Sequence, residues 1–175
     1  MDIGTSIDWG SIVESLGPRL YRYFCSRFED VVADDLTQET LVRLVDKFNK
    51  GHFDDSRGTI EMFAFGIARF VRLEELKKKN HSYLNEENEN SSPDENSLVE
   101  NFEKASEINL LKSGIAALGE PQQEIMLLMV DKEWNFNEIA KHMEMPLGTI
   151  KSHVHRAKKN IFEFISVKKG VSCGR

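Results

Sequence analysis

The sequence predicts an all-α protein built from two small helical domains that a flexible acidic linker joins. Apolar residues recur at helical spacing along most of the chain, and no run alternates as a half-buried strand would. A central segment has too few apolar residues to build a core. The composition, 40% hydrophobic and 30% charged, is typical of a globular protein.

The first domain is predicted to span residues 1–80 and to contain three helices, at 8–29, 33–48 and 59–79. Each range carries apolar residues three or four positions apart. Glycines and polar residues between 51 and 58 break the pattern before the third helix begins.

The linker is predicted at residues 81–108. This segment contains one basic and eight acidic residues, so it holds most of the excess negative charge of a chain whose net charge is −6. Asparagine, serine and proline are frequent within it, and such a composition favours an extended, solvated chain.

The second domain is predicted at residues 109–175. Pro121 suits a first helical turn, where its missing N–H costs nothing. Asn135 and Glu138 have the spacing of a capping box, which satisfies free N–H groups at a helix start. The predicted helices cover 109–118, 121–131, 135–143 and 147–164.

The last two of these helices have the spacing of a helix-turn-helix, with Pro146 and Gly148 near the connection. Ile150, Val154 and Ala157 begin an apolar stripe on the second helix, and polar residues cover its other faces. Cations and hydrogen-bond donors on an outer helix face suit contacts with phosphates and base edges. An ordinary surface helix can show the same face, but the turn and the preceding helix favour DNA recognition.

These residues resemble region 4 of bacterial RNA polymerase sigma factors, through 138–140 (Glu-Ile-Ala), 146–152 (Pro-Leu-Gly-Thr-Ile-Lys-Ser) and 155–157 (His-Arg-Ala). The resemblance implies that this domain reads the minus-thirty-five promoter element. It implies that bases or nearby phosphates are contacted by Thr149, Lys151, Ser152, His153, His155, Arg156, Lys158 and Lys159.

Three residues depart from the family pattern. His153 and Gln123 stand where an arginine is usual, and Glu144 stands where the turn usually has glycine. We therefore expect Glu144 to adopt a positive φ, unless the turn itself differs.

The helix at 33–48 is predicted to carry an acidic outer face. Leu41, Leu44, Val45 and Phe48 form the predicted core stripe, and Asp46 lies on the opposite side. From the pattern alone this outer face could be simply solvated. However, 35–40 (Asp-Leu-Thr-Gln-Glu-Thr) and 46–48 (Asp-Lys-Phe) strongly resemble sigma region 2.2. The resemblance implies docking on the clamp helices of the largest polymerase subunit through Asp35, Leu36, Gln38, Glu39 and Val42.

The segment from Phe53 to Lys79 is a polar turn followed by an aromatic-rich helix with terminal lysines, and it resembles sigma regions 2.3 and 2.4. Phe63 and Phe65 cannot share one helix face, so we expect at least one to be buried. Phe70 stands where the family frequently has asparagine. The resemblance implies that the melted minus-ten element is contacted by Arg57, Gly58, Thr59, Ile60, Arg69, Arg72, Lys77 and Lys78.

Together these motifs identify the chain as a member of the sigma factors of the extracytoplasmic-function type. The resemblance implies a non-enzymatic initiation subunit that stabilises promoter melting. Its implied partners are core RNA polymerase, through the clamp helices and the flap of the second-largest subunit, promoter DNA in duplex and melted form, and an anti-sigma factor. No cofactor or metal is expected. A stand-alone helix-turn-helix regulator is the main alternative, and an enzyme using the acidic cluster of 34–39 is a weaker one.

Cysteine usage and hydropathy agree with a cytoplasmic protein. Cys25 and Cys173 are far apart and lack metal-site spacing, so neither a disulfide framework nor a zinc site is expected. The first residues lack the basic and apolar pattern of a signal peptide, and no apolar run is long enough for membrane insertion, so a cytoplasmic location is expected.

Overall fold

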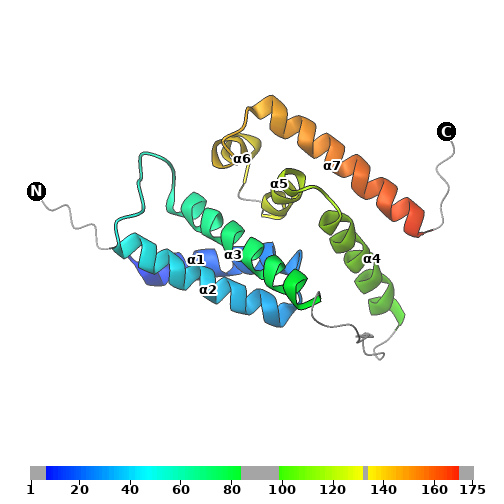
Figure 1. The fold of residues 1–175 in the computed structure, drawn as a ribbon, viewed down its shortest axis with the longest axis horizontal. Helices are drawn as coiled ribbons and strands as arrows, with labels where there is room; N and C mark the ends of the chain where they lie inside the picture. The colour runs from blue at the N-terminus through cyan, green and yellow to red at the C-terminus, as the bar shows by residue number, and fades with distance from the viewer. Residues whose placement is uncertain (1–6, 84–98, 132–133, 170–175) are drawn as a thin grey trace, which may run out of the picture. The chain divides into compact units, whose positions relative to one another are not determined.

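The computed structural model describes residues 7–83, 99–131 and 134–169. Within these ranges the chain is helical and has no strand, so the predicted all-α class is confirmed (Figure 1). The helices are α1 Trp9–Cys25, α2 Asp30–Asn49, α3 Ile60–Tyr83, α4 Val99–Ala116, α5 Glu120–Val130, α6 Phe136–His142 and α7 Leu147–Lys168. None of them is long and apolar enough to cross a membrane.

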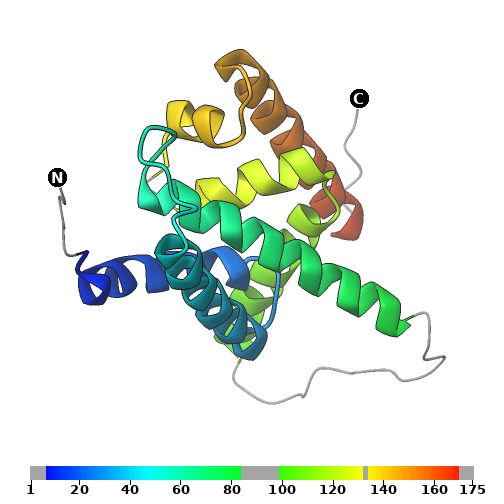
Figure 2. The same cartoon turned by 60° about the vertical axis from the view of Figure 1, so that its left-hand side comes forward.

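The chain divides into two compact units, with the division inside α3 between Leu73 and Glu74. In the first unit α1, α2 and α3 lie together (Figure 2). The side chains buried among them are mainly aromatic and aliphatic. Tyr23 of α1 meets Phe65 of α3 edge-on, with ring centroids 5.7 Å apart. Phe65 is fully buried, which confirms the prediction that at least one of Phe63 and Phe65 lies in the core.

The inner face of α2 includes threonines as well as aliphatic residues. Ala33, Leu36, Thr37, Thr40 and Leu44 are buried and recur at helical spacing. The Thr37 and Thr40 hydroxyls donate to the main-chain oxygens of Ala33 and Leu36, both over 2.7 Å. Because these bonds satisfy the hydroxyls, the threonines pack as small apolar groups.

In the second unit α7 packs against α4, α5 and α6. The contact with α4 is close at Gly114, where a Cβ atom would lie 3.3 Å from Cγ2 of Ile161. The core combines Ile115, Leu127, Leu128, Ile139 and Ile150, all buried.

The predicted linker is too wide, because helices enter it from both sides. α3 continues to Tyr83, and α4 begins at Val99, ten residues before the predicted start. Glutamate, lysine and alanine, which favour helix, are frequent between 99 and 107, but the acidic composition obscured this propensity. Residues 84–98 lie outside the described residues, so an acidic linker there stays a prediction.

Candidate nucleic-acid and polymerase interfaces

The helix-turn-helix begins with the predicted capping box. The Asn135 side-chain oxygen accepts from the N–H groups of Asn137 and Glu138, over 2.9 and 3.1 Å. The Asn135 N–H in turn donates to the Glu138 carboxylate over 2.8 Å. This reciprocal pair determines where α6 begins.

The turn between α6 and α7 closes through a left-handed residue. Glu144 has φ 52°, the positive value expected from its position. The Met145 N–H donates to the main-chain oxygen of Ala140 over 3.0 Å, which ends α6. Pro146 then precedes α7, and its oxygen accepts from the N–H groups of Thr149 and Ile150.

The two sides of α7 differ as the sequence predicts. Ile150, Val154, Ala157 and Ile161 are buried and face the rest of the unit. The opposite side exposes Lys151, Ser152, His155, Arg156, Lys158 and Lys159. α7 has no acidic residue before Glu163, so its first four turns present only positive or neutral groups.

Some of these outer side chains already make local contacts. The Ser152 hydroxyl donates to the Gly148 main-chain oxygen over 2.9 Å, and its own oxygen can still accept. Nε of Arg156 donates to the Ser152 main-chain oxygen over 3.3 Å. Lys159 lies 3.8 Å from the Glu163 carboxylate, and both side chains are exposed. Such exposed pairs are weak enough to exchange for a phosphate.

His153 and Thr149 lie at the edge of this surface and are only half-exposed. Nδ1 of His153 is buried and has no hydrogen-bond partner within the described chain. Only the remaining part of the imidazole can therefore take part in an outward contact.

In the first unit, the loop before α3 is an ordered turn. The Asp54 carboxylate accepts from the Ser56 hydroxyl over 2.6 Å and from the Ser56 N–H over 3.0 Å. These bonds, the hydroxyl first, lower the pKa of Asp54. The Thr59 hydroxyl accepts from the Met62 N–H over 3.4 Å at the start of α3. The turn presents Arg57 and Thr59 outward, with Gly58 and Ile60 half-buried beside them.

Further along α3, the predicted phosphate contacts divide into two groups. Lys77 and Lys78 are exposed, and Arg69 is half-exposed. Lys78 also lies 3.5 Å from Glu75 one turn earlier. These three cations are accessible.

Arg72 corrects the sequence prediction. Its side chain is fully buried, and Nε donates to the Tyr23 hydroxyl over 3.1 Å. A second guanidinium, that of Arg27, has a lowered pKa. Burial is the larger cause, and the positive charge of Arg72 lowers the pKa further. Arg72 is therefore an internal structural residue and cannot reach a phosphate without opening the unit.

The outer face of α2 exposes four of the five residues predicted to dock on polymerase: Asp35, Gln38, Glu39 and Val42. The Gln38 amide donates to Asp34 over 2.8 Å, and Nε of Arg43 donates to Glu39 over 2.7 Å. The Asp35 side chain has no hydrogen bond or ion pair with any other described residue. Its carboxylate is thus available for an incoming cation.

Leu36 is the second correction, because only 7% of its surface is exposed. Leu36 belongs to the inner face of α2. Because Thr37 and Thr40 are buried as well, this face is turned about the helix axis relative to the predicted core stripe. The sequence interpretation also missed Val31, which is 77% exposed. Val31 precedes Asp35 by one turn, so Val31, Asp35, Gln38 and Val42 follow one stripe along α2. The spacing of 31, 35, 38 and 42 could have revealed it.

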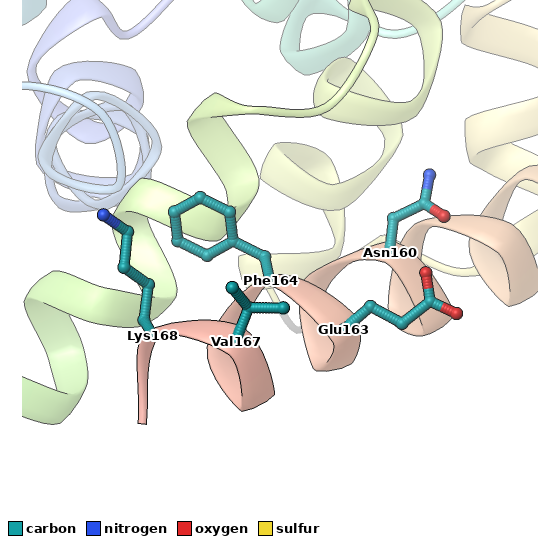
Figure 3. Close-up of a pocket in the computed structure, with 5 residues that line it drawn as sticks. All are labelled: Asn160, Glu163, Phe164, Val167 and Lys168. Carbon is teal, nitrogen blue, oxygen red and sulfur yellow. The ribbon is translucent and has the colours of Figure 1, made fainter. Parts of the chain in front are cut away.

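The described part of the chain offers no cluster of metal-ligating side chains. No group of three His, Cys, Asp or Glu side chains there could hold a metal ion. A hollow of about 370 Å³ runs along α7, and Figure 3 shows its lining side chains Asn160, Glu163, Phe164, Val167 and Lys168. All five come from one helix, so they form a groove on a helix face.

Comparisons with known proteins place two parts of the chain in one family. Residues 12–82 match the family model of sigma-70 region 2, and residues 108–161 match that of sigma-70 region 4. The chain belongs to the sigma-70 family. It is an RNA polymerase sigma factor of the extracytoplasmic-function type, and its function is transcription initiation through core polymerase and promoter DNA.

Two solved structures share the fold of this sigma factor. The sigma factor RpoE from Bartonella quintana, in complex with the anti-sigma factor NepR, is 20% identical with a TM-score of 0.63, covering 91% of this chain and 98% of that one. CnrH, in complex with the cytosolic domain of CnrY, is 16% identical with a TM-score of 0.66, covering 94% of this chain and 91% of that one. No curated protein sequence matches the chain.

Proposed function

We propose that the exposed stripe of α2 docks the sigma factor on core polymerase. The observation that carries this assignment is Asp35, an exposed carboxylate with no partner among the described residues, flanked by exposed Gln38 and Val42. A cationic helix of the polymerase clamp would pair with the carboxylates, and Val42 would supply apolar contact. Val31 extends the stripe by one turn.

The docking assignment is tested by titrating labelled core polymerase with full-length variants. Asp35→Lys and the double change Gln38→Lys, Glu39→Lys should each weaken core binding by at least about tenfold, because each replaces attraction by repulsion. Glu14→Lys, at an exposed position on α1, is the matched control and should bind as the wild type does. Unchanged core affinity of the α2 variants would refute the assignment.

The promoter contacts divide between the two units. The first four turns of α7 read the minus-thirty-five element, with Lys151, Ser152, His155 and Arg156 toward bases and Lys158 and Lys159 toward phosphates. Thr149 and His153 contribute at the edge. In the first unit the 57–60 turn approaches the melted minus-ten element, while Arg69, Lys77 and Lys78 neutralise its phosphates.

Transcripts made in vitro by core polymerase and this sigma factor would test whether the protein recognises a minus-thirty-five and a minus-ten element. Sequences upstream of the mapped starts should share two motifs at a constant spacing. A stand-alone regulator, in contrast, would protect its operator without polymerase, so DNA binding measured with and without core separates the two functions.

In this proposal the sigma factor is a non-enzymatic, cytoplasmic subunit that an anti-sigma factor holds inactive. Support for the last point is the fold shared with RpoE, whose structure contains the anti-sigma factor NepR. Affinity capture with the full-length chain, with core polymerase as competitor, tests it. A captured inhibitor should compete with core, and a captured protein that leaves core binding unchanged would contradict the role.

A further inference from the structure

His155 is exposed on the α7 surface that we assign to the minus-thirty-five element. Its side chain makes no hydrogen bond, ion pair or ring contact with any other described residue. Histidine is the side chain that changes charge between about pH 5 and 8, so this surface can carry His155 as a neutral or as a cationic group. The neighbouring charges determine which form bound DNA would select.

On α7 itself these neighbouring charges are positive. Lys151 and Lys159 lie one turn before and one turn after His155, and Lys158 lies three positions after it. All three lysines are exposed, and α7 has no carboxylate before Glu163, more than two turns further on. No acidic side chain of α7 is therefore placed to stabilise an imidazolium at this position.

The helices packed against α7 do not supply such a carboxylate either, because they cover its buried side. Glu138 of α6 is engaged in the capping box, and Glu107 of α4 pairs with Lys169 at the far end of α7. Within the described chain no charged or titratable group of α4, α5, α6 or the connecting turns bonds to His155. The other groups of this kind are Lys112, Glu120, Glu124, Asp131, Lys141, His142 and Glu144.

His153, two positions earlier on α7, is less suited to carry a charge. Its Nδ1 is buried and has no hydrogen-bond partner within the described chain. A proton on this atom would be a buried donor without an acceptor, which is costly. Both ring nitrogens of an imidazolium are donors, and the exposed His155 can offer them to an acceptor outside the protein.

We propose that His155 takes up a proton when α7 binds the minus-thirty-five element, so that promoter affinity rises as the pH falls through neutrality. Phosphate oxygens are negative, and the major-groove edge of guanine presents only acceptors, so both favour the imidazolium over the neutral ring. Because binding and protonation are linked, this gain in affinity is lost again as the pH rises. The inference rests on the proposed contact between α7 and the promoter.

The test uses holoenzyme assembled from core polymerase and full-length sigma variants. The probe is a fluorescent duplex fragment of a promoter mapped with the wild type, and affinity is measured at about pH 6 and about pH 8 over a range of salt concentrations. On going to the lower pH, wild-type affinity should rise by at least about threefold more than that of His155→Gln, whose amide does not titrate. The slope of log affinity against log salt should also steepen by up to about one in the wild type relative to the variant, because the imidazolium adds one cation to the DNA surface.

His153→Gln is the matched control, since it removes the other histidine of α7 and should keep the pH dependence of the wild type. The melting temperature and core affinity of both variants should equal those of the wild type. Equal pH dependence of the wild type and His155→Gln would overturn the proposal, as would its loss in His153→Gln.

The wild type alone also decides the question if His155→Gln binds too weakly to measure, because equal salt slopes at the two pH values would then refute proton uptake. Wild-type holoenzyme that binds promoters with a pH-independent affinity would refute this inference and leave the proposed function standing. Wild-type holoenzyme that binds no promoter would refute the proposed function as well.

Discussion

Arg72 on α3 donates a hydrogen bond from Nε to the hydroxyl of Tyr23 on α1, over 3.1 Å, and both side chains are buried. The bond joins two helices across the core of the first unit. A guanidinium removed from water depends on such acceptors, since desolvating a charge without partners is costly.

We expect Tyr23→Phe to lower the free energy of unfolding of the first unit by about 1.5–3 kcal/mol, the usual contribution of a hydrogen bond to a charged group. The measurement is urea unfolding followed by Trp9 fluorescence in a Trp134→Phe background. Tyr21→Phe, which alters a half-exposed tyrosine of the same helix, should have a much smaller effect. Equal stability of both variants would argue against a structural role for the bond.

Glu144 adopts a left-handed conformation, φ 52°, in the turn between α6 and α7. We expect Glu144→Gly to stabilise the second unit by about 1 kcal/mol, because glycine adopts positive φ without the steric cost that other residues carry. Glu144→Ala is the matched control, since it removes the same carboxylate but keeps a Cβ atom. Urea unfolding followed by Trp134 fluorescence in a Trp9→Phe background measures both, and the prediction fails if alanine stabilises as much as glycine.

Gln123 on α5 caps the carboxyl end of α4 from within the core. Its amide nitrogen donates to the main-chain oxygens of Ile115 and Ala116, over 3.2 and 3.4 Å. Gln123→Leu should destabilise the second unit by about 1–3 kcal/mol, because buried carbonyl groups would lose their donor. Gln122→Leu changes the neighbouring, more exposed glutamine and should cost less. A comparable loss in the two variants by the same Trp134 assay would contradict the capping role.

Lys158 is exposed on α7 and has no ion pair within the described chain. If it contacts a phosphate, Lys158→Gln should weaken holoenzyme binding to different promoters to a similar extent. It should also reduce the slope of log affinity against log salt by about one. Lys168→Gln, about 15 Å further along the helix axis, should leave the slope unchanged. An unchanged slope for Lys158→Gln would remove this residue from the DNA surface.

Lys169 donates a hydrogen bond to Glu107 over 2.8 Å, and this contact lowers the pKa of Glu107. Lys169→Met should therefore raise the pKa of Glu107 toward its ordinary value, as carboxyl NMR titration would measure. The pair stabilises the fold above the unfolded-state pKa of glutamate and loses this effect as the pH falls through the lower folded-state pKa. Lys168→Met is the control. A Glu107 pKa that stays low in Lys169→Met would exclude the lysine as its cause.

Periodicity together with local signals predicted α5 and α6 of the second unit well. The predicted helix at 121–131 is α5 Glu120–Val130, and that at 135–143 is α6 Phe136–His142. Local signals determine these boundaries, since Pro121 and the Asn135–Glu138 capping box act within one helical turn. The start of α4 was missed because the good helix formers between 99 and 108, three glutamates, a lysine and an alanine, lie within a strongly acidic segment.

The sequence by itself determined the class of fold, the family, the exposed face of α7 and most of that of α2, because helical spacing and local motifs depend on neighbours along the chain. Only the tertiary structure decided the positions of Arg72 and Leu36. A cation on a basic helix resembles a phosphate contact until a tyrosine from 49 residues earlier in the chain proves to be its partner. Burial depends on which face another helix covers, and that packing contact is not encoded in any single segment.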